Sequence, residues 1–173
     1  AAPALTLRAG HRAIEHIRHN GLQPQDVHMI PGAAGGPKAL GIQGLDLALF
    51  GEWLPRAPQP RSLIGASIGS WRFASACMPD PVTTLRQLGE LYTNMRFPKG
   101  VSIQRISAAC GEMLDELLGG EFDTILTNPN YYLNIVVVKS LGLLQHDSRT
   151  RLGLGLSGVI GANLLGRRHL GRF

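Results

Sequence analysis

Residues 61–76 read RSLIGASIGSWRFASA, and they join a short apolar segment to a helix-compatible segment through a turn of small residues. Residues 62–66 have the composition of a strand, and residues 68–77 contain no proline and favour a helix. Between them stands the Gly-x-Ser-x-Gly pattern, with Ser67 at its centre. This pattern is typical of a nucleophile elbow, in which a serine occupies a strained turn between a strand and a helix. The stretch therefore predicts Ser67 as a catalytic nucleophile.

Two glycines flank Ser67 at a spacing that has a physical reason. Gly65 and Gly69 stand two residues before and two residues after the serine. An elbow needs very small residues at these positions because the strand and the helix approach each other closely. The helix that follows directs its dipole and its free N–H groups toward a developing oxyanion. A small-residue turn that only packs a helix on a sheet is the alternative interpretation, since the chain contains 22 glycines.

Strand-like and helix-like segments alternate along the chain, and this alternation favours an α/β fold with a mainly parallel sheet. The 173 residues are enough for a buried core, and we expect a single domain over residues 1–173. The β-branched residues of segment 131–139 predict a buried strand. Strands are expected at residues 26–32, 62–66, 122–127 and 131–139, and helices at residues 7–20, 37–53, 68–77, 82–95 and 102–118.

The composition argues against several classes of protein. Hydrophobic residues make up 44% of the chain and charged residues 17%, as in an ordinary globular protein. The net charge of +5 is spread along the chain without interleaved aromatic residues, which argues against nucleic acid as a partner. The longest apolar stretch, residues 152–166, falls short of the roughly 20 residues that span a bilayer. Cys77 and Cys110 form no metal-ligand pattern and predict two reduced, buried thiols in a cytoplasmic protein without metal or cofactor.

A second candidate feature is the glycine-rich segment PGAAGGPKALG at residues 31–41, which lies between a predicted strand and a predicted helix. Such a loop can direct successive N–H groups at one anion, either a phosphate or the oxyanion of an acyl intermediate. The phosphate alternative lacks support because Lys38 is followed by Ala39, so the hydroxyl of a Walker loop is missing.

The oxyanion alternative requires a nucleophile nearby, and the chain offers one at the next strand-to-helix turn. Because the carboxyl ends of parallel strands meet at one edge of a sheet, we expect the loop and Ser67 to be neighbours. Pro37 has no N–H group, which leaves Gly35, Gly36 and Lys38 as the expected backbone donors of an oxyanion hole.

The glycine loop and the serine turn together resemble the patatin-like phospholipase family. The family's Gly-Gly-Gly-x-[Arg/Lys]-Gly loop is similar to AGGPKA at residues 34–39, with Lys38 at the basic position, and its elbow is matched at Ser67. The likeness covers roughly residues 26–80. It implies a three-layer α/β/α sandwich, and hydrolysis of lipid acyl esters by a Ser–Asp dyad in which no histidine takes part.

Two departures from the family pattern concern the loop and the base. Ala34 and Ala39 replace two loop glycines. The family's aspartate stands in an Asp-Gly-[Gly/Ala] motif, and no aspartate of this chain is followed by glycine. We therefore expect the dyad aspartate to lie in a C-terminal segment that this polypeptide lacks. The chain by itself is then expected to be a poor hydrolase, because loss of the base costs several orders of magnitude in rate.

Two other functions stay open from the sequence. One is a Ser–Asp–His α/β-hydrolase in which His146 or His169 is the base and Asp123 or Asp147 orients it. The other is a catalytically impaired domain that binds acyl chains or a membrane surface through the arginine-flanked apolar residues 151–168.

Overall fold

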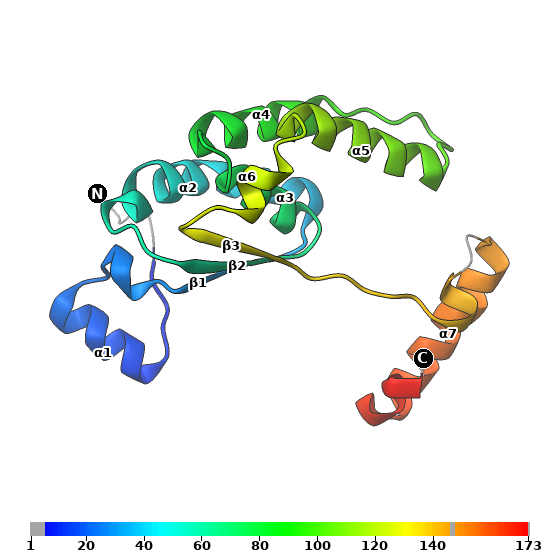
Figure 1. Ribbon diagram of the computed structural model, residues 1–173. Helices are drawn as coiled ribbons and strands as arrows, with labels where there is room; N and C mark the ends of the chain where they lie inside the picture. Colours follow the sequence, from blue (N-terminus) through cyan, green and yellow to red (C-terminus); the bar gives the residue numbers. More distant parts are fainter. Residues whose placement is uncertain (1–5, 146–147, 173) are drawn as a thin grey trace. The chain divides into compact units, whose positions relative to one another are not determined.

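The computed structural model describes residues 6–145 and 148–172 (Figure 1). The chain divides into two compact units, with the boundary between Val136 and Val137. The first unit contains three strands and most of the helices, and the second contains one long helix with a short helical segment on each side.

The sheet of the first unit has three strands in the order β1-β2-β3, and both strand pairs are parallel. The strands are β1 (Met29–Gly32), β2 (Arg61–Gly65) and β3 (Tyr131–Ile135). Gly32 pairs with Gly65, and Gly65 pairs with Ile135, so the carboxyl ends of all three strands meet at one edge. The expected α/β fold with a parallel sheet is confirmed at this level.

Two of the longer helices, at residues 81–94 and 103–118, begin directly after a residue whose side chain caps them. The Asp80 side chain accepts a hydrogen bond from the Thr83 N–H at 3.0 Å, and the Ser102 side chain accepts one from the Arg105 N–H at 3.2 Å. Such N-caps satisfy donors that have no acceptor inside the helix. The helical segments of this unit are α1 (His11–Asn20), η1 (Pro24–Asp26), η2 (Gly36–Ile42), α2 (Gln43–Ala48), η3 (Leu49–Trp53), η4 (Leu54–Arg56), α3 (Ile68–Ala76), α4 (Pro81–Asn94), α5 (Ile103–Leu118) and α6 (Phe122–Leu126).

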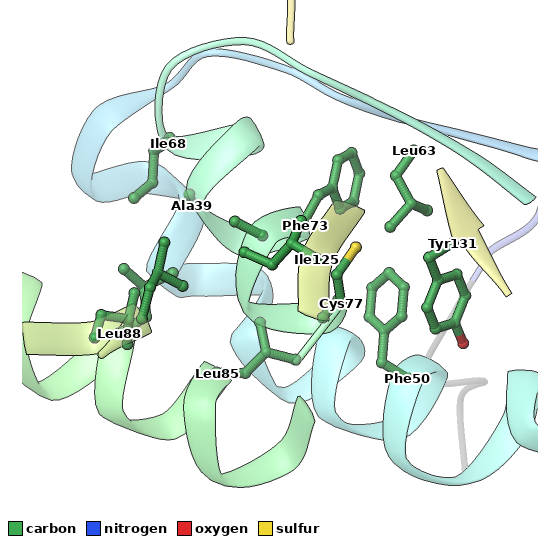
Figure 2. Packing of buried hydrophobic residues seen from close by; sticks show 14 of the residues in the cluster. Ala39, Phe50, Leu63, Ile68, Phe73, Cys77, Leu85, Leu88, Ile125 and Tyr131 are labelled. Atoms are coloured by element: carbon green, nitrogen blue, oxygen red, sulfur yellow. The ribbon is translucent and has the colours of Figure 1, made fainter. Parts of the chain in front are cut away.

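The core lies between the sheet and helices α2 to α6, which cover one face of the sheet in Figure 1. Ile30, Leu63 and Leu133 are register partners on adjacent strands, and all three belong to the packed core. Phe50 lies edge-on to the rings of Phe73 and Tyr131, at centroid distances of 6.2 and 5.6 Å (Figure 2). Burial of these apolar side chains is the main stabilising contribution to the unit.

The two thiols differ in burial. Cys77, at the end of α3, is fully buried, and burial raises the pKa of its thiol to about 12. Cys110, in α5, is only half-buried. The expected burial is therefore confirmed for Cys77 and holds in part for Cys110.

Two predicted strands need correction. The segment predicted as a strand at residues 122–127 instead forms helix α6 over residues 122–126, and both the N–H and the hydroxyl of the following Thr127 donate to the carbonyl of Asp123. So short an apolar run has no periodicity that separates a helix from a strand. The predicted strand at residues 131–139 ends at Ile135 and is buried only in its first part, since Tyr131 is buried but Ile135 is 57% exposed and Val138 89% exposed.

The second unit consists of η5 (Gly142–Gln145), α7 (Arg149–Leu165) and η6 (Arg167–Arg172). A Cβ atom on Gly155 of α7 would lie 2.7 Å from the Leu144 side chain, so the helix packs closely on η5. Large apolar side chains of α7 are nevertheless exposed, among them Leu154, Ile160 and Leu164. Among the described residues, no helix is both long and apolar enough to cross a membrane.

Candidate active site

Ser67 lies in a two-residue turn between the last residue of β2 and the first residue of α3. Its φ of 53° and ψ of −129° make it the one non-glycine residue with positive φ in the described part of the chain. This conformation costs a non-glycine residue of order 1–3 kcal/mol, and it persists only where the surrounding structure enforces it. The side chain is exposed to solvent. The strained conformation thus falls on the one residue that the sequence predicts as nucleophile.

The flanking glycines permit a backbone approach that no other residue allows. A Cβ atom on Gly65 would lie 2.5 Å from the N atom of Ser70, in the first turn of α3. A Cβ atom on Gly69 would collide with the carbonyl oxygen of Gly32, at the end of β1. Since such separations do not occur in real proteins, any side chain at either position would displace α3. The two glycines therefore hold the helix directly against the ends of two strands.

Hydrogen bonds fix the backbone of the turn and leave its hydroxyl unengaged. The Ala66 N–H donates to the Gly32 carbonyl at 3.1 Å, while the Ser70 N–H and hydroxyl donate to the Ser67 carbonyl at 2.9 and 2.5 Å. Ile68 is the first residue of α3, so its N–H has no acceptor within the helix. No described residue forms a hydrogen bond with the Ser67 hydroxyl. The hydroxyl therefore lies beside a helix N-terminus with a free donor.

The glycine-rich loop leaves the neighbouring strand at the same edge of the sheet. Residues 33–35 are exposed, and η2 then begins at Gly36 with a φ of +52°. The N–H of Lys38 donates to the Gly35 carbonyl at 3.3 Å, so this expected donor is already used inside the loop. The N–H groups of Gly35 and Gly36 donate to no other described residue. Of the three expected donors, these two are free to bind an anion.

The loop and the serine turn are adjacent because their strands are adjacent. Gly32 and Gly65 are register partners, and each ends its strand just before one of the two turns. A Cβ atom on Gly69 would also lie 3.0 Å from the carbonyl oxygen of Ala33, the first loop residue. The structure thus brings the beginning of the loop into contact with the helix that follows Ser67.

Of the candidate histidines and aspartates, only Asp123 is placed relative to Ser67, and it lies toward the opposite edge of the sheet. Asp123 lies in α6, which leads into the amino end of β3, whereas Ser67 follows the carboxyl end of the parallel strand β2. His146 and Asp147 lie outside the described residues, and His169 lies in η6 of the second unit, with no described side-chain position. No group of residues in the described ranges has the composition and spacing of a metal site.

Sequence reasoning missed a buried ion pair between α2 and α3. Asp46 of α2 accepts two hydrogen bonds from the Arg72 guanidinium of α3, from Nε at 2.6 Å and from Nη2 at 2.5 Å. The side chains are only 4% and 11% exposed. Each residue is the one charged residue of an apolar helical segment, Asp46 in LDLALF and Arg72 in SWRFASA, which could have indicated a buried charge. Nothing in the sequence shows that the two residues contact each other.

A cavity of about 470 Å³ lies along the loop, and apolar side chains form most of its wall. Arg72 and Asp46 contribute polar groups to it, and Ser67 is not part of its lining. Its further lining residues include Ala33, Ala34, Gly35, Lys38, Ile42 and Leu45. The arrangement offers an exposed hydroxyl, free backbone donors and an adjacent apolar hollow.

Comparison with protein-family models, with curated proteins and with solved structures gives no match to this chain. The assignment of a function therefore depends on the geometry of the two turns and on the motifs that they carry.

Proposed function

We propose that this chain is a serine acyl hydrolase of the patatin-like type, with Ser67 as the nucleophile. The observation that carries the proposal is the positive φ of Ser67 at a parallel-strand-to-helix turn, one strand away from a loop with free N–H groups. Strain of this kind is concentrated at functional sites, and a packing turn would place a glycine there without cost.

In the proposed reaction, the Ser67 oxygen attacks the carbonyl carbon of an acyl ester. The new O–C bond forms as the carbonyl becomes a tetrahedral oxyanion, which accepts hydrogen bonds from the N–H groups of Gly35 and Gly36. The Ile68 N–H, at the start of α3, is a further donor at the same edge. The alkoxide then leaves with a proton, and water hydrolyses the acyl-enzyme to release the acid and restore the hydroxyl.

The proton acceptor in this proposal is an aspartate carboxylate, as the resemblance implies. No described carboxylate forms a hydrogen bond with Ser67, so the described residues supply the nucleophile and the oxyanion donors but not the base. Loss of the base lowers the rate of such enzymes by about 10³- to 10⁴-fold or more. We accordingly expect slow turnover by this chain and a reactive but weakly activated serine.

The three-layer sandwich is part of the same proposal. Pro31, Ile64 and Asn134 are register partners on the face of the sheet opposite the core, and all are exposed or half-exposed. A further layer on this face would complete the architecture. The proposed substrate is a lipid acyl ester, which fits the apolar cavity beside the loop and a net charge of +5 that favours anionic lipid surfaces.

A fluorophosphonate probe tests the proposal, because the serine oxygen forms a bond to phosphorus as fluoride leaves. We expect one adduct, mapped to Ser67 by peptide mass spectrometry and absent from Ser67→Ala. Ser75→Ala is the matched control, since Ser75 is a buried serine of the same helix whose hydroxyl donates to the Trp71 carbonyl and not to the turn. The proposal is wrong if no adduct forms, or if the adduct persists in Ser67→Ala.

The two histidine candidates provide a separate test of the mechanism. A Ser–Asp–His hydrolase loses its reactivity in His146→Ala or His169→Ala, whereas the proposed dyad is indifferent to both changes. The rate of adduct formation in the two variants decides between these mechanisms. Binding to lipid vesicles without any adduct at Ser67 would instead favour a lipid-binding domain that has no turnover.

A further inference from the structure

The ion pair of Asp46 and Arg72 lies on the wall of the cavity that runs along the glycine-rich loop. Resting on the proposed function, we propose that this pair positions the oxyanion loop relative to Ser67. We assign both as positioning residues, because their side chains hydrogen-bond to each other on the cavity wall, and neither is hydrogen-bonded to Ser67 or to the loop. Their role is to fix the direction in which the free N–H groups of the loop point.

The location of each partner in the chain supports this role. Arg72 stands five residues after Ser67, on the helix that begins at the serine turn. Asp46 lies on α2, which continues without a break from η2 and thus from the loop itself. The pair therefore joins the first helix after the nucleophile to the first helix after the oxyanion loop.

The exposed part of the loop has few contacts of its own, whereas the helical run after it packs on α3 and α4, and the Gln43 amide donates to the Leu85 carbonyl at 2.8 Å. Residues 33–35 are exposed, and a Cβ atom on Gly36 would meet nothing closer than the Tyr92 hydroxyl at 3.7 Å. Behind the loop, the buried side chains of Ala39 and Ile68 lie near each other in Figure 2, and both line a small cavity of about 10 Å³ together with Asp46 and Arg72. The ion pair is the strongest directional interaction among these groups.

The ion pair is better suited to fix the relative orientation of the two helices than to stabilise the fold. A planar guanidinium that donates two parallel hydrogen bonds to one carboxylate fixes both distance and angle. Apolar contacts such as Ala39 with Ile68 have no such direction. A buried ion pair contributes little net stability compared with apolar residues of the same volume, because desolvation of the charges offsets their attraction. An apolar replacement can therefore preserve the fold while it removes the angular constraint.

The test compares phosphonylation of Ser67 in the wild type and in Asp46→Leu/Arg72→Met, by measuring the maximal labelling rate constant and the probe concentration at half-maximal rate. We expect a double variant with native circular dichroism and a urea midpoint close to that of the wild type. Its maximal rate constant should fall about 100-fold, the effect of losing one oxyanion donor, with half-saturation changed less than about threefold. A folded double variant that is labelled at the wild-type rate overturns the inference.

If the double variant does not fold, Arg72→Lys provides the test. Lysine retains the positive charge but cannot donate two parallel hydrogen bonds to the Asp46 carboxylate. We expect at least a tenfold lower maximal rate at an unchanged urea midpoint, and an unchanged rate overturns the inference. The matched control is Arg105→Ala/Glu112→Ala, which removes an exposed ion pair on α5 and should leave the rate unchanged. Absence of labelling in the wild type would overturn the proposed function itself, which is a different outcome from equal labelling of wild type and variants.

Discussion

Two strand-to-helix turns leave the same edge of the sheet, and they differ in the kind of residue that adopts a positive φ. The first turn, from β1 to η2, is an exposed loop that ends in Gly36 at positive φ, where glycine is unstrained. The second, from β2 to α3, has only two residues and places the positive φ on Ser67, where a side chain is strained. Backbone donors of an unstrained loop thus stand at the same sheet edge as the hydroxyl of a strained residue. In the proposed acyl transfer, the first turn binds the oxyanion and the second turn carries the nucleophile.

The largest predicted effect concerns the ion pair that joins α2 to α3. Asp46→Asn should lower the free energy of unfolding by about 3 to 5 kcal/mol, because it leaves a buried guanidinium without a counter-charge. Asp46→Leu/Arg72→Met should recover most of that loss. Urea unfolding of Asp46→Leu, Arg72→Met and the double variant measures the coupling between the two residues, and additive losses would contradict a coupled ion pair.

The next effect tests the tightness of the second turn. Gly69→Ala should destabilise the protein by about 3 kcal/mol, because the new Cβ atom collides with the backbone of Gly32. Gly111→Ala is the same substitution in the open middle of α5 and should stabilise the protein by about 0.5 to 1 kcal/mol. Equal urea midpoints for the two variants would show that the turn is loosely packed.

Two substitutions, one in each turn, should change the free energy of unfolding in opposite directions. Ser67→Gly relieves a strained positive φ and should raise the free energy of unfolding by about 1 kcal/mol, after the entropic cost of glycine. Gly36→Ala introduces the same strain and should lower it by about 1 kcal/mol. Thermal and urea unfolding measure both, and a loss of stability in Ser67→Gly would remove the evidence for strain at the nucleophile.

The smallest effect lies within the loop. Gly35 has a φ of −167°, which any residue adopts, and a Cβ atom there would make only an ordinary contact with Lys38 at 3.9 Å. Gly35→Ala should therefore change the free energy of unfolding by less than about 0.5 kcal/mol. If Gly35→Ala lowered the free energy of unfolding as much as Gly36→Ala, the positive φ of Gly36 would not explain the difference between the two positions.

The serine turn was predictable because its constraints are local. Small residues at fixed spacing, an apolar run before them and a proline-free run after them are all visible within sixteen residues. The relation of the turn to the glycine loop followed from the rule that parallel strands end at one edge. The sequence could not pair Asp46 with Arg72, because their contact depends on how two helices pack.

Other expectations failed where tertiary context decides. The helix expected at residues 37–53 is a continuous helical run in which 3-10, α and π segments follow one another. The segment at residues 122–127 was too short to show a periodicity, and β-branched residues after Ile135 predicted burial that the described structure does not show. Residue propensities indicate which residues favour a strand, but the packing of neighbouring helices and strands determines whether that strand is buried.

The most direct test of the central claim is a crystal structure of the chain with Ser67 phosphonylated. We predict a phosphonyl oxygen within about 3 Å of backbone N–H groups from Gly35, Gly36 and Ile68, with Ser67 still at positive φ. A phosphonyl group that points into solvent without a backbone donor, or a Ser67 that relaxes to negative φ, would contradict this claim.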